Sequence, residues 1–321
     1  MIEAENISKK RGNAAALKDV SLQVPEGTIH GLIGADGAGK TTLFDILVTL
    51  LRPDTGTASV GGHDIREQWR EVRKTVGYMP AAFSLYGDLS VRENLEFFAR
   101  IYRQPAGRIA SLAGDIWAQI EPFSDRPAAQ LSGGMKQKLA LCCALIHDPE
   151  VLMLDEPTTG VDPVSRSEFW AALRKLAGKG KTVLVSTSYM DEAARCDRIT
   201  LLHRGTVLDS LVPNEAEAHY RGTLYEIGSA DIGLNTRMLH ILRSWSLSCG
   251  CYSFGDRIHL GTALPAMRAE TVAGYLRGQG IDTSQVSVRP ASPTVEDLFI
   301  QLTSASPEAE ETENSWTNEA S

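Results

Sequence analysis

The sequence predicts an α/β protein in which a glycine-rich loop joins a buried strand to a helix, followed by a small C-terminal α+β domain. A short apolar run at residues 28–33 fits a buried strand, and apolar residues recur at helical spacing after residue 42. A second apolar run, at 151–154, ends on two carboxylates. After Pro213 the alternation of strand and helix patterns starts again, as expected for a separate domain.

The glycine-rich loop fits the phosphate-binding pattern G-x-x-x-x-G-K-[ST]. Its glycines permit positive φ, and its N–H groups with the helix N-terminus form a nest for an anion. Lys40 adds a charge for the β- and γ-phosphates, and the Thr41 hydroxyl can bind Mg²⁺. The alternative, an ordinary glycine turn, is disfavoured by the strand and helix on either side. The predicted nucleotide-binding residues are Gly34, Ala35, Asp36, Gly37, Ala38, Gly39, Lys40, Thr41 and Thr42.

Composition narrows the class of protein. The 321 residues suggest about two domains, and a net charge of -8 argues against nucleic acid as the main partner. The longest apolar run, at about 139–146, is far shorter than the ~20 residues that cross a bilayer. Because no signal segment opens the chain, we expect a cytoplasmic protein that meets a membrane only through a partner.

Five cysteines without a signal segment suggest free thiols. The pair Cys249 and Cys251 allows two interpretations: half of a metal site, or a strand with two buried thiols. No second Cys or His pair lies nearby at zinc spacing, which favours the buried thiols.

The elements of the first domain follow from local patterns. Residues 2–7 and 18–24 alternate like two antiparallel strands, and further strands are expected at 57–60 and 76–79. From about 84 to 125 the pattern is helical, with Val91, Leu95, Phe98 and Tyr102 on one face. Another helix opens at 131–137 and continues through residue 146. We therefore expect a domain at 1–212 with an antiparallel β subdomain and a helical subdomain at about 84–140.

The apolar run at 151–154 closes on Asp155 and Glu156. Downstream of a phosphate-binding loop this is the Walker-B pattern, which places Asp155 at the carboxyl end of a central strand, facing Mg²⁺. The alternative is an ordinary surface acid at a strand end, which the phosphate-binding loop upstream disfavours. A helix around Trp170, a strand at 182–185 and a hairpin around Arg204 complete the domain.

The remaining chain reads as a small α+β domain at 220–303. Its expected elements are a strand at 224–227, a helix at 234–245, strand material at 249–260, a helix at 267–276, a strand at 286–288 and a final helix from Thr294. The tail at 304–321 holds several glutamates and no Lys or Arg, which predicts disorder.

Residues 131–137 (LSGGMKQ) resemble the signature motif of ATP-binding-cassette (ABC) ATPases, and Ser132 precedes Asp155 by 23 residues, as in that family. Residues 154–163 are similar to the family's Walker B running into its D-loop. The resemblance covers roughly 1–212, and three ordered motifs are far more specific than the loop alone. The chain looks most like the ATPase subunits of drug- or polysaccharide-type exporters, which often end in a segment like 292–299.

The resemblance implies a mechanism. Two such domains, identical or different, would meet head to tail, each ATP lying between the P-loop of one and the signature of the other. Ser132, Gly133 and Gly134 would then serve the ATP on the partner's P-loop. Asp155 would hold Mg²⁺, and Glu156 would orient and deprotonate the attacking water. A transmembrane permease subunit would bind the pair at the cytoplasmic face of the membrane.

Three positions depart from the family pattern. Arg11 stands where an aromatic residue usually stacks on adenine, although a guanidinium can also stack on a base. Ala81 replaces the Q-loop glutamine. Ser188 replaces the switch histidine, and its short, uncharged hydroxyl should bind a γ-phosphate more weakly. Together they predict a site that binds ATP and turns over slowly, with Ser188 as the weakened catalytic position.

Two functions remain open from the sequence: an ATP-hydrolysing exporter subunit, and an ATP-clamping regulatory subunit with little hydrolysis of its own. Ala81 and Ser188 favour the second, and Glu156 favours the first. A P-loop kinase or GTPase is disfavoured because it has no such signature, and no Asn-Lys-x-Asp motif is present. A DNA-repair ATPase would need a long coiled-coil insertion that this length excludes.

Overall fold

The structure is a computed structural model that describes residues 1–264 and 267–304. It divides into two compact units, one at Met1–Pro213 and one that begins at Asn214. The expected acidic tail lies outside the described residues, apart from Ser304, which ends the last helix. No helix in the described part of the chain is long and apolar enough to span a bilayer.

The first unit opens with an antiparallel sheet in the order β2-β1-β4-β5. Its strands are β1 (Ile2–Arg11), β2 (Ala14–Val24), β4 (Thr55–Val60) and β5 (His63–Asp64). β1 and β2 are longer than their alternating pattern predicts. They stay paired up to Arg11 and Ala14, which lie on either side of a tight turn. The antiparallel β subdomain is thus present.

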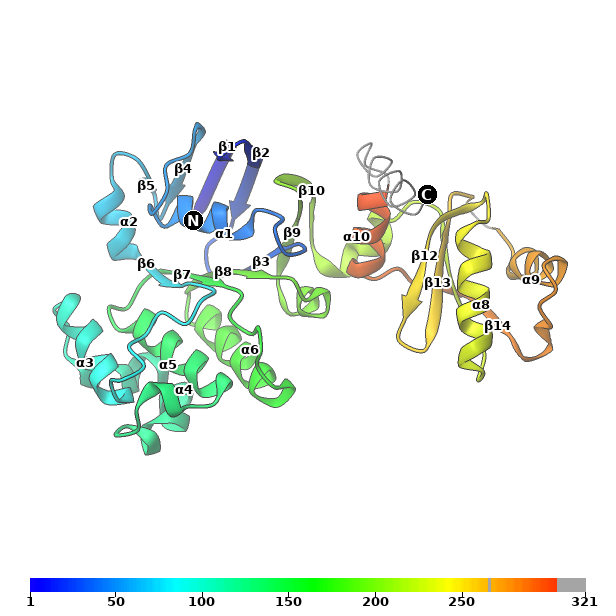
Figure 1. The fold of residues 1–321 in the computed structure, drawn as a ribbon. Helices are drawn as coiled ribbons and strands as arrows, with labels where there is room; N and C mark the ends of the chain where they lie inside the picture. The colour runs from blue at the N-terminus through cyan, green and yellow to red at the C-terminus, as the bar shows by residue number, and fades with distance from the viewer. Residues whose placement is uncertain (265–266, 305–321) are drawn as a thin grey trace. The chain divides into compact units, whose positions relative to one another are not determined.

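A six-stranded sheet in the order β10-β9-β3-β8-β7-β6 forms the centre of this unit (Figure 1). Its strands are β3 (Ile29–Ile33), β6 (Val76–Met79), β7 (Val151–Asp155), β8 (Thr182–Thr187), β9 (Arg198–His203) and β10 (Thr206–Leu211). All neighbouring pairs are parallel except β9 with β10. In parallel sheets ligands bind beyond the carboxyl ends of the strands. Here those ends carry the glycine loop, Asp155 and the segment after Thr187.

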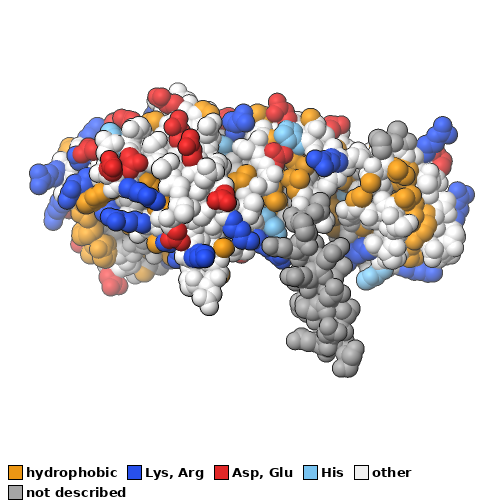
Figure 2. Space-filling view, turned by 90° about the horizontal axis from the view of Figure 1, so that it is seen from above, with side chains coloured by type: hydrophobic (Ala, Val, Ile, Leu, Met, Phe, Trp, Pro, Cys, Tyr) orange, Lys and Arg blue, Asp and Glu red, His pale blue; other side chains and the backbone are white. Residues whose placement is uncertain are grey.

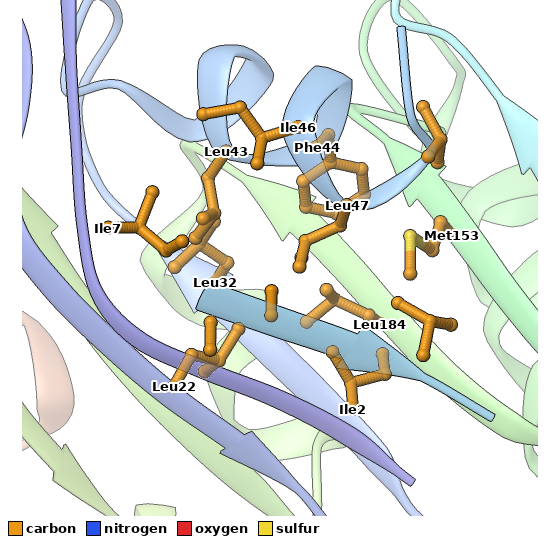
Figure 3. Packing of buried hydrophobic residues seen from close by; sticks show 14 of the residues in the cluster. Ile2, Ile7, Leu22, Leu32, Leu43, Phe44, Ile46, Leu47, Met153 and Leu184 are labelled. Atoms are coloured by element: carbon orange, nitrogen blue, oxygen red, sulfur yellow. The ribbon is translucent and has the colours of Figure 1, made fainter. Parts of the chain in front are cut away.

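Helix α1 (Lys40–Leu47) lies between the two sheets, and α6 (Pro163–Gly178) lies on the other side of the six-stranded sheet (Figure 1). Leu43, Phe44 and Leu47 on α1 are fully buried and pack with side chains of both sheets (Figure 3). Burying such side chains stabilises the fold by about 1.5–3 kcal/mol each. The apolar contacts of α1 therefore fix the position of the loop that precedes it.

The helical part of this unit consists of α3 (Val91–Ile101), α4 (Ile109–Ile120) and α5 (Gly133–Leu145). The single helical pattern expected from 84 to 125 is thus broken after Ile101, and α4 is kinked at Gly114. The start of α3 is fixed by a capping box, in which the Ser90 and Glu93 side chains each bond to the other's backbone N–H. Helix α2 (Trp69–Thr75) was not expected from the sequence.

On the face shown in Figure 2, acidic and basic side chains of the first unit are interspersed, and basic ones gather at the end that carries α2. Arg70 and Arg73 on α2 are exposed, and both guanidinium groups stack on the Trp69 ring, 4.3 and 4.8 Å from its centroid. Such stacking covers an aromatic ring that would otherwise face water.

His30 is a fully buried polar residue beneath the glycine loop, in β3. Its Nε2 lies 2.9 Å from the Thr200 hydroxyl, whereas its Nδ1 has no hydrogen-bond partner among the described residues. Burial, with the nearby positive charge of Arg198, lowers the pKa of His30 from 6.5 to about 4. The imidazole is therefore neutral at physiological pH.

The second unit has a four-stranded antiparallel sheet in the order β12-β13-β11-β14. Its main elements are β11 (Thr223–Gly228), α8 (Ile232–Arg243), β12 (Ser248–Phe254), β13 (Arg257–Thr262), α9 (Ala269–Gly278) and β14 (Ser287–Ala291), flanked by α7 (Ala216–His219) and α10 (Val295–Ser304). The segment at 249–260 forms two strands, so the order is β-α-β-β-α-β, a split βαβ arrangement. Its core contains Tyr225, Leu242 and Val272.

The expectation of two buried thiols in one strand is wrong for Cys249. Both cysteines lie in β12, but Cys251 is buried and Cys249 is exposed. Two residues apart on a regular strand they would face the same side. The pairing of β12 with β13 is irregular between Ser248 and Gly250, and this bulge turns Cys249 outward. All five cysteines are free, as expected.

The last helix is held by a buried carboxylate in its first turn. Asp297 accepts hydrogen bonds from Thr294 and from the Tyr252 hydroxyl, and lies 2.5 Å from His259 Nδ1. Because Tyr252 and His259 belong to β12 and β13, this cluster joins α10 to the hairpin. A buried carboxylate with several hydrogen bonds gives such a junction a defined geometry.

We predict that a chain ending at Val212 still folds and binds ATP with the affinity of the full chain. The reason is that the compact unit ends at Pro213 and all residues of the predicted loop lie before it. Titration calorimetry with Mg-ATP on both proteins checks this. A truncated chain that is soluble and folded but no longer binds nucleotide would contradict the domain assignment.

Candidate functional site

The glycine loop leaves β3 at Ile33 and enters α1 at Lys40. Gly37 and Gly39 have φ of 77° and 108°, which L side chains rarely adopt. At Gly39 a Cβ atom would also lie 2.6 Å from the Ala16 carbonyl oxygen. These glycines let the backbone curl ahead of α1, whose first N–H groups have no intrahelical partner. The curled backbone and open helix start fit a phosphate group.

Lys40 is buried in this loop, with 5% of its surface exposed. Its Nζ donates hydrogen bonds to the carbonyl oxygens of Gly34 and Ala35, at 2.7 and 3.1 Å, and pairs with Glu156 Oε1 at 2.9 Å. The two carbonyl contacts are hydrogen bonds, whereas the contact with Glu156 is an ion pair, because Glu156 Oε1 has no hydrogen-bond partner among the described residues. Two of the three N–H donors of the ammonium group are thus used, and a phosphate can bind through the third or replace one of these partners.

Asp155 ends β7 and is fully buried. The Ser186 hydroxyl donates a hydrogen bond to Asp155 Oδ1, whereas Oδ2 is buried without a partner among the described residues. Burial raises the pKa of Asp155, and the hydroxyls of Ser186 and Thr41 oppose that rise. An unpaired carboxylate oxygen beside a threonine hydroxyl is a suitable pair of ligands for Mg²⁺.

Glu156 follows at once, with a left-handed backbone (φ 49°), and its N–H donates to Ser186 Oγ at 2.9 Å. Its Oε2 accepts hydrogen bonds from the Thr159 hydroxyl at 3.0 Å and from the Ser188 N–H at 3.4 Å. The carboxylate is thus held between Lys40 and the segment after β8. In this place it can accept a proton from a water next to a bound phosphate.

The three unusual positions have different surroundings. Ser188 touches Glu156 through its backbone N–H. Ala81 is exposed in the loop after β6 and offers only a methyl group. The Arg11 side chain, 53% exposed at the end of β1, places its guanidinium 2.7 Å from Asp45 Oδ2 on α1. To stack on a base, the Arg11 guanidinium must give up its ion pair with Asp45 or keep it while it stacks.

The signature residues lie at the start of α5, in the helical part. Ser132 is the N-cap, and its hydroxyl accepts a hydrogen bond from Met135 N at 3.4 Å. Ser132 and Gly133 are exposed, and Gly134 packs so closely that a Cβ atom there would lie 2.6 Å from Ser165. An exposed helix start with a serine cap suits a phosphate presented by another molecule.

The structure therefore brings together the loop, Asp155, Glu156 and Ser188, all at the carboxyl ends of β3, β7 and β8. Sequence reasoning missed the hydroxyl of Ser186, which donates to the Asp155 carboxylate and accepts from the Glu156 backbone N–H. It also missed Glu192, a buried residue four positions after Ser188. Ser186 could have been noticed as a polar residue that follows the apolar part of β8, two positions before Ser188. Nothing in the sequence separated Glu192 from the adjacent Asp191.

Comparison with known proteins gives consistent matches. A sequence profile of the family described as "ABC transporter" matches residues 17–159. The chain is 35% identical to the daunorubicin resistance ATP-binding protein DrrA3 of Streptomyces coeruleorubidus, over 94% of this chain and 95% of that protein. It is 39% identical to the Nod factor export ATP-binding protein I of Burkholderia orbicola (strain AU 1054), over 66% of this chain and 71% of that protein.

A third relative is the probable multidrug ABC transporter ATP-binding protein YbhF of Escherichia coli (strain K12), at 41% identity over 68% of this chain. The matched part spans only 38% of the length of YbhF. Among solved structures, the ATP-binding subunit of an ABC transporter matches with a TM-score of 0.62 and 26% identity, over 68% of this chain and 92% of that one. A dimeric post-hydrolysis cassette, MJ0796 bound to ADP and Pi, matches with a TM-score of 0.60 and 28% identity, over 66% of this chain and 98% of that one.

Proposed function

The chain belongs to the family of ABC transporter ATP-binding proteins, and on this premise we propose that it binds and hydrolyses Mg-ATP to drive an exporter. The observation that carries the proposal is the meeting of Lys40, Asp155 and Glu156 beyond the carboxyl ends of β3 and β7, the strands on either side of β8. The names of the relatives, which refer to daunorubicin resistance and Nod factor export, favour export as the direction. They do not favour the alternative of a purely regulatory ATP clamp.

In the proposed site, the loop at 34–42 holds the phosphates, and Thr41 and Asp155 hold Mg²⁺. When bound, Mg²⁺ neutralises charge that develops on the transferred phosphoryl group. The unpaired Asp155 Oδ2 supports this assignment, because the structure gives that buried oxygen no other partner among the described residues. Glu156 orients the attacking water and accepts its proton.

Nucleotide binding would also change the partner of Glu156. Lys40 now pairs with Glu156 Oε1 and with two loop carbonyls. The γ-phosphate is a stronger, charged acceptor for the same donors. Lys40 would turn toward it, and the Glu156 carboxylate would be released to face the attacking water. The ion pair of Lys40 with Glu156 would thus hold the carboxylate of the general base on Lys40 until ATP binds.

We propose that the complete machine contains a second ABC ATPase domain and a transmembrane permease subunit at the cytoplasmic face of the membrane. The exposed signature at Ser132 and Gly133 supports the second domain, because its helix start is open to another molecule. Ala81 and Ser188 further suggest that the chain's own site turns over slowly. Neither side chain can supply the group that family members use at that position.

We predict that Lys40→Ala weakens Mg-ATP binding by about 10- to 150-fold, which corresponds to a charge-assisted hydrogen bond of about 1.5–3 kcal/mol. The variant also leaves the Glu156 charge without its partner, which repels phosphate. Titration calorimetry measures the effect. Lys179→Ala, which removes the same charge from an exposed site, is the matched control and should bind ATP normally. Equal affinities for Lys40→Ala and the parent chain would contradict the proposed binding site.

A further inference from the structure

We propose that Glu192 is a positioning residue for hydrolysis: it holds the two segments whose hydrogen bonds fix the general base Glu156. The inference rests on the proposed function, because it concerns the same reaction. It assigns a task to a side chain that is fully buried.

Glu192 lies in the short turn at Met190–Arg195 and is 0% exposed, whereas the side chain of the adjacent Asp191 is 74% exposed. Glu192 Oε1 accepts hydrogen bonds from the Thr158 hydroxyl at 2.7 Å and from Trp170 Nε1 at 3.0 Å. Glu192 Oε2 accepts one from the Thr187 hydroxyl at 2.7 Å. A buried carboxylate needs such donors, and they in turn fix its position.

Thr187 connects Glu192 to the switch position. Its Oγ1 donates to Glu192 and accepts a hydrogen bond from Tyr189 N at 3.0 Å. The two bonds fix the backbone on both sides of Ser188, whose N–H points to Glu156 Oε2 at 3.4 Å. Because the Ser188 contact is made by the backbone, its direction depends on how the backbone of this segment is held and not on a rotatable side chain.

Thr158 forms the second connection. It lies in the turn after β7, next to Thr159, whose hydroxyl donates to Glu156 Oε2 at 3.0 Å. Both connections from Glu192 therefore converge on the same carboxylate oxygen, while Glu156 Oε1 faces Lys40. A misplacement of about 1 Å in a reacting group can cost about 100-fold in rate. The network is therefore placed to influence the rate without touching the substrate.

The positive charge near Glu192 comes from α6. Arg166 Nε lies 3.7 Å from Glu192 Oε1, and its guanidinium stacks on the Tyr189 ring, 4.3 Å from the centroid. The Arg166 guanidinium therefore balances the charge of the Glu192 carboxylate and packs on Tyr189, the residue after Ser188. Trp170, also on α6, donates a hydrogen bond to Glu192, but no further hydrogen bond of the described residues links it to Glu156. It therefore offers an internal control.

The test compares Thr187→Val, Thr158→Val and Trp170→Phe, each of which removes one hydrogen bond to Glu192, in the full chain assembled with its partners. We expect each valine variant to lower the Glu156-dependent part of kcat, which is the difference between the parent and Glu156→Gln, at least about 10-fold. The KM for ATP should stay unchanged within about twofold. Trp170→Phe should keep kcat, and Thr187→Ser, which restores the hydroxyl, should recover it. Equal losses for Trp170→Phe and Thr187→Val would overturn the proposal.

A second arm asks whether the effect passes through Glu156. In a Glu156→Gln background, Thr187→Val should cause no further loss, because the two changes act on one group. An undiminished loss there would mean that Glu192 supports the fold in general, and the proposal would fail.

Hydrogen–deuterium exchange of segment 186–190 provides a readout that needs no turnover. We expect faster exchange in Thr187→Val than in the parent chain, and unchanged exchange in Trp170→Phe. Unchanged exchange in both would overturn the proposal. Should the parent show no Glu156-dependent turnover, the proposed hydrolysis fails instead, and exchange still decides the role of Glu192.

Discussion

Replacing Ser132 by arginine is expected to lower the ATPase rate of the assembled transporter by about 10²–10³, and by more than Glu156→Gln does. The reason is the division of parts between two sites. The site on this chain's own P-loop has Ala81 and Ser188 in place of the glutamine and the histidine. The opposite site would combine a complete partner with the intact signature at Ser132, so most turnover would occur there.

The structure sharpens the choice of variant. Ser132 is exposed and caps α5 through its hydroxyl, so an arginine removes the cap and fills the space where the partner's γ-phosphate would lie. Ser132→Thr keeps a capping hydroxyl and serves as the control, with a rate close to that of the parent. Steady-state phosphate release measures all three variants. The asymmetric arrangement is wrong if the chain alone hydrolyses ATP as a homodimer at an ordinary rate and Ser188→His leaves that rate unchanged.

Acidification is expected to remove about 3 kcal/mol of folding stability through His30 alone. The folded pKa of about 4 lies below the ordinary value of 6.5, at about 1.36 kcal/mol per pKa unit. Because the pKa of His30 is lower in the folded chain, the unfolded chain binds a proton at this residue between about pH 6.5 and pH 4, where the folded chain does not. The contribution is therefore fully present above pH 6.5 and is lost as the pH falls toward about 4.

Urea unfolding between about pH 7 and pH 4 measures this effect, with His30→Gln as the test variant. Glutamine keeps a polar group that can bond to the Thr200 hydroxyl but cannot titrate. Its stability should fall less steeply with acid than that of the parent. His240→Gln, at an exposed position on α8, should follow the parent curve. Parallel curves for His30→Gln and the parent would show that His30 is not the titrating group.

Elements that depend on local pattern were predictable from the sequence. β3, the glycine loop and α1 are encoded by an apolar run, a glycine motif and a helical repeat, and all three lie where expected. α2 was missed because its seven residues bury only Val72, which gives no helical period to detect. The hairpin of β12 and β13 and the outward turn of Cys249 depend on strand pairing and a bulge, which no local pattern records.

The candidate site divides in the same way. The motif residues could be named in advance because each motif is contiguous in the chain. The pair of Lys40 with Glu156 could not, because it depends on β3 and β7 flanking the same strand, β8. Glu192 could not be told from Asp191, because only the direction of the turn decides which carboxylate faces inward.

The strand order has a consequence for how the protein folds as it is synthesised. β3 ends at Ile33, but its two neighbours, β8 and β9, are complete only at Thr187 and His203. At about 5–20 residues per second, the ribosome needs roughly 8–35 s to supply them. During that time an apolar strand has both edges unpaired, and contacts this distant in sequence form slowly. The nascent chain is therefore exposed to aggregation in an interval that a chaperone can protect, and synonymous changes that slow translation between β3 and β9 lengthen that interval.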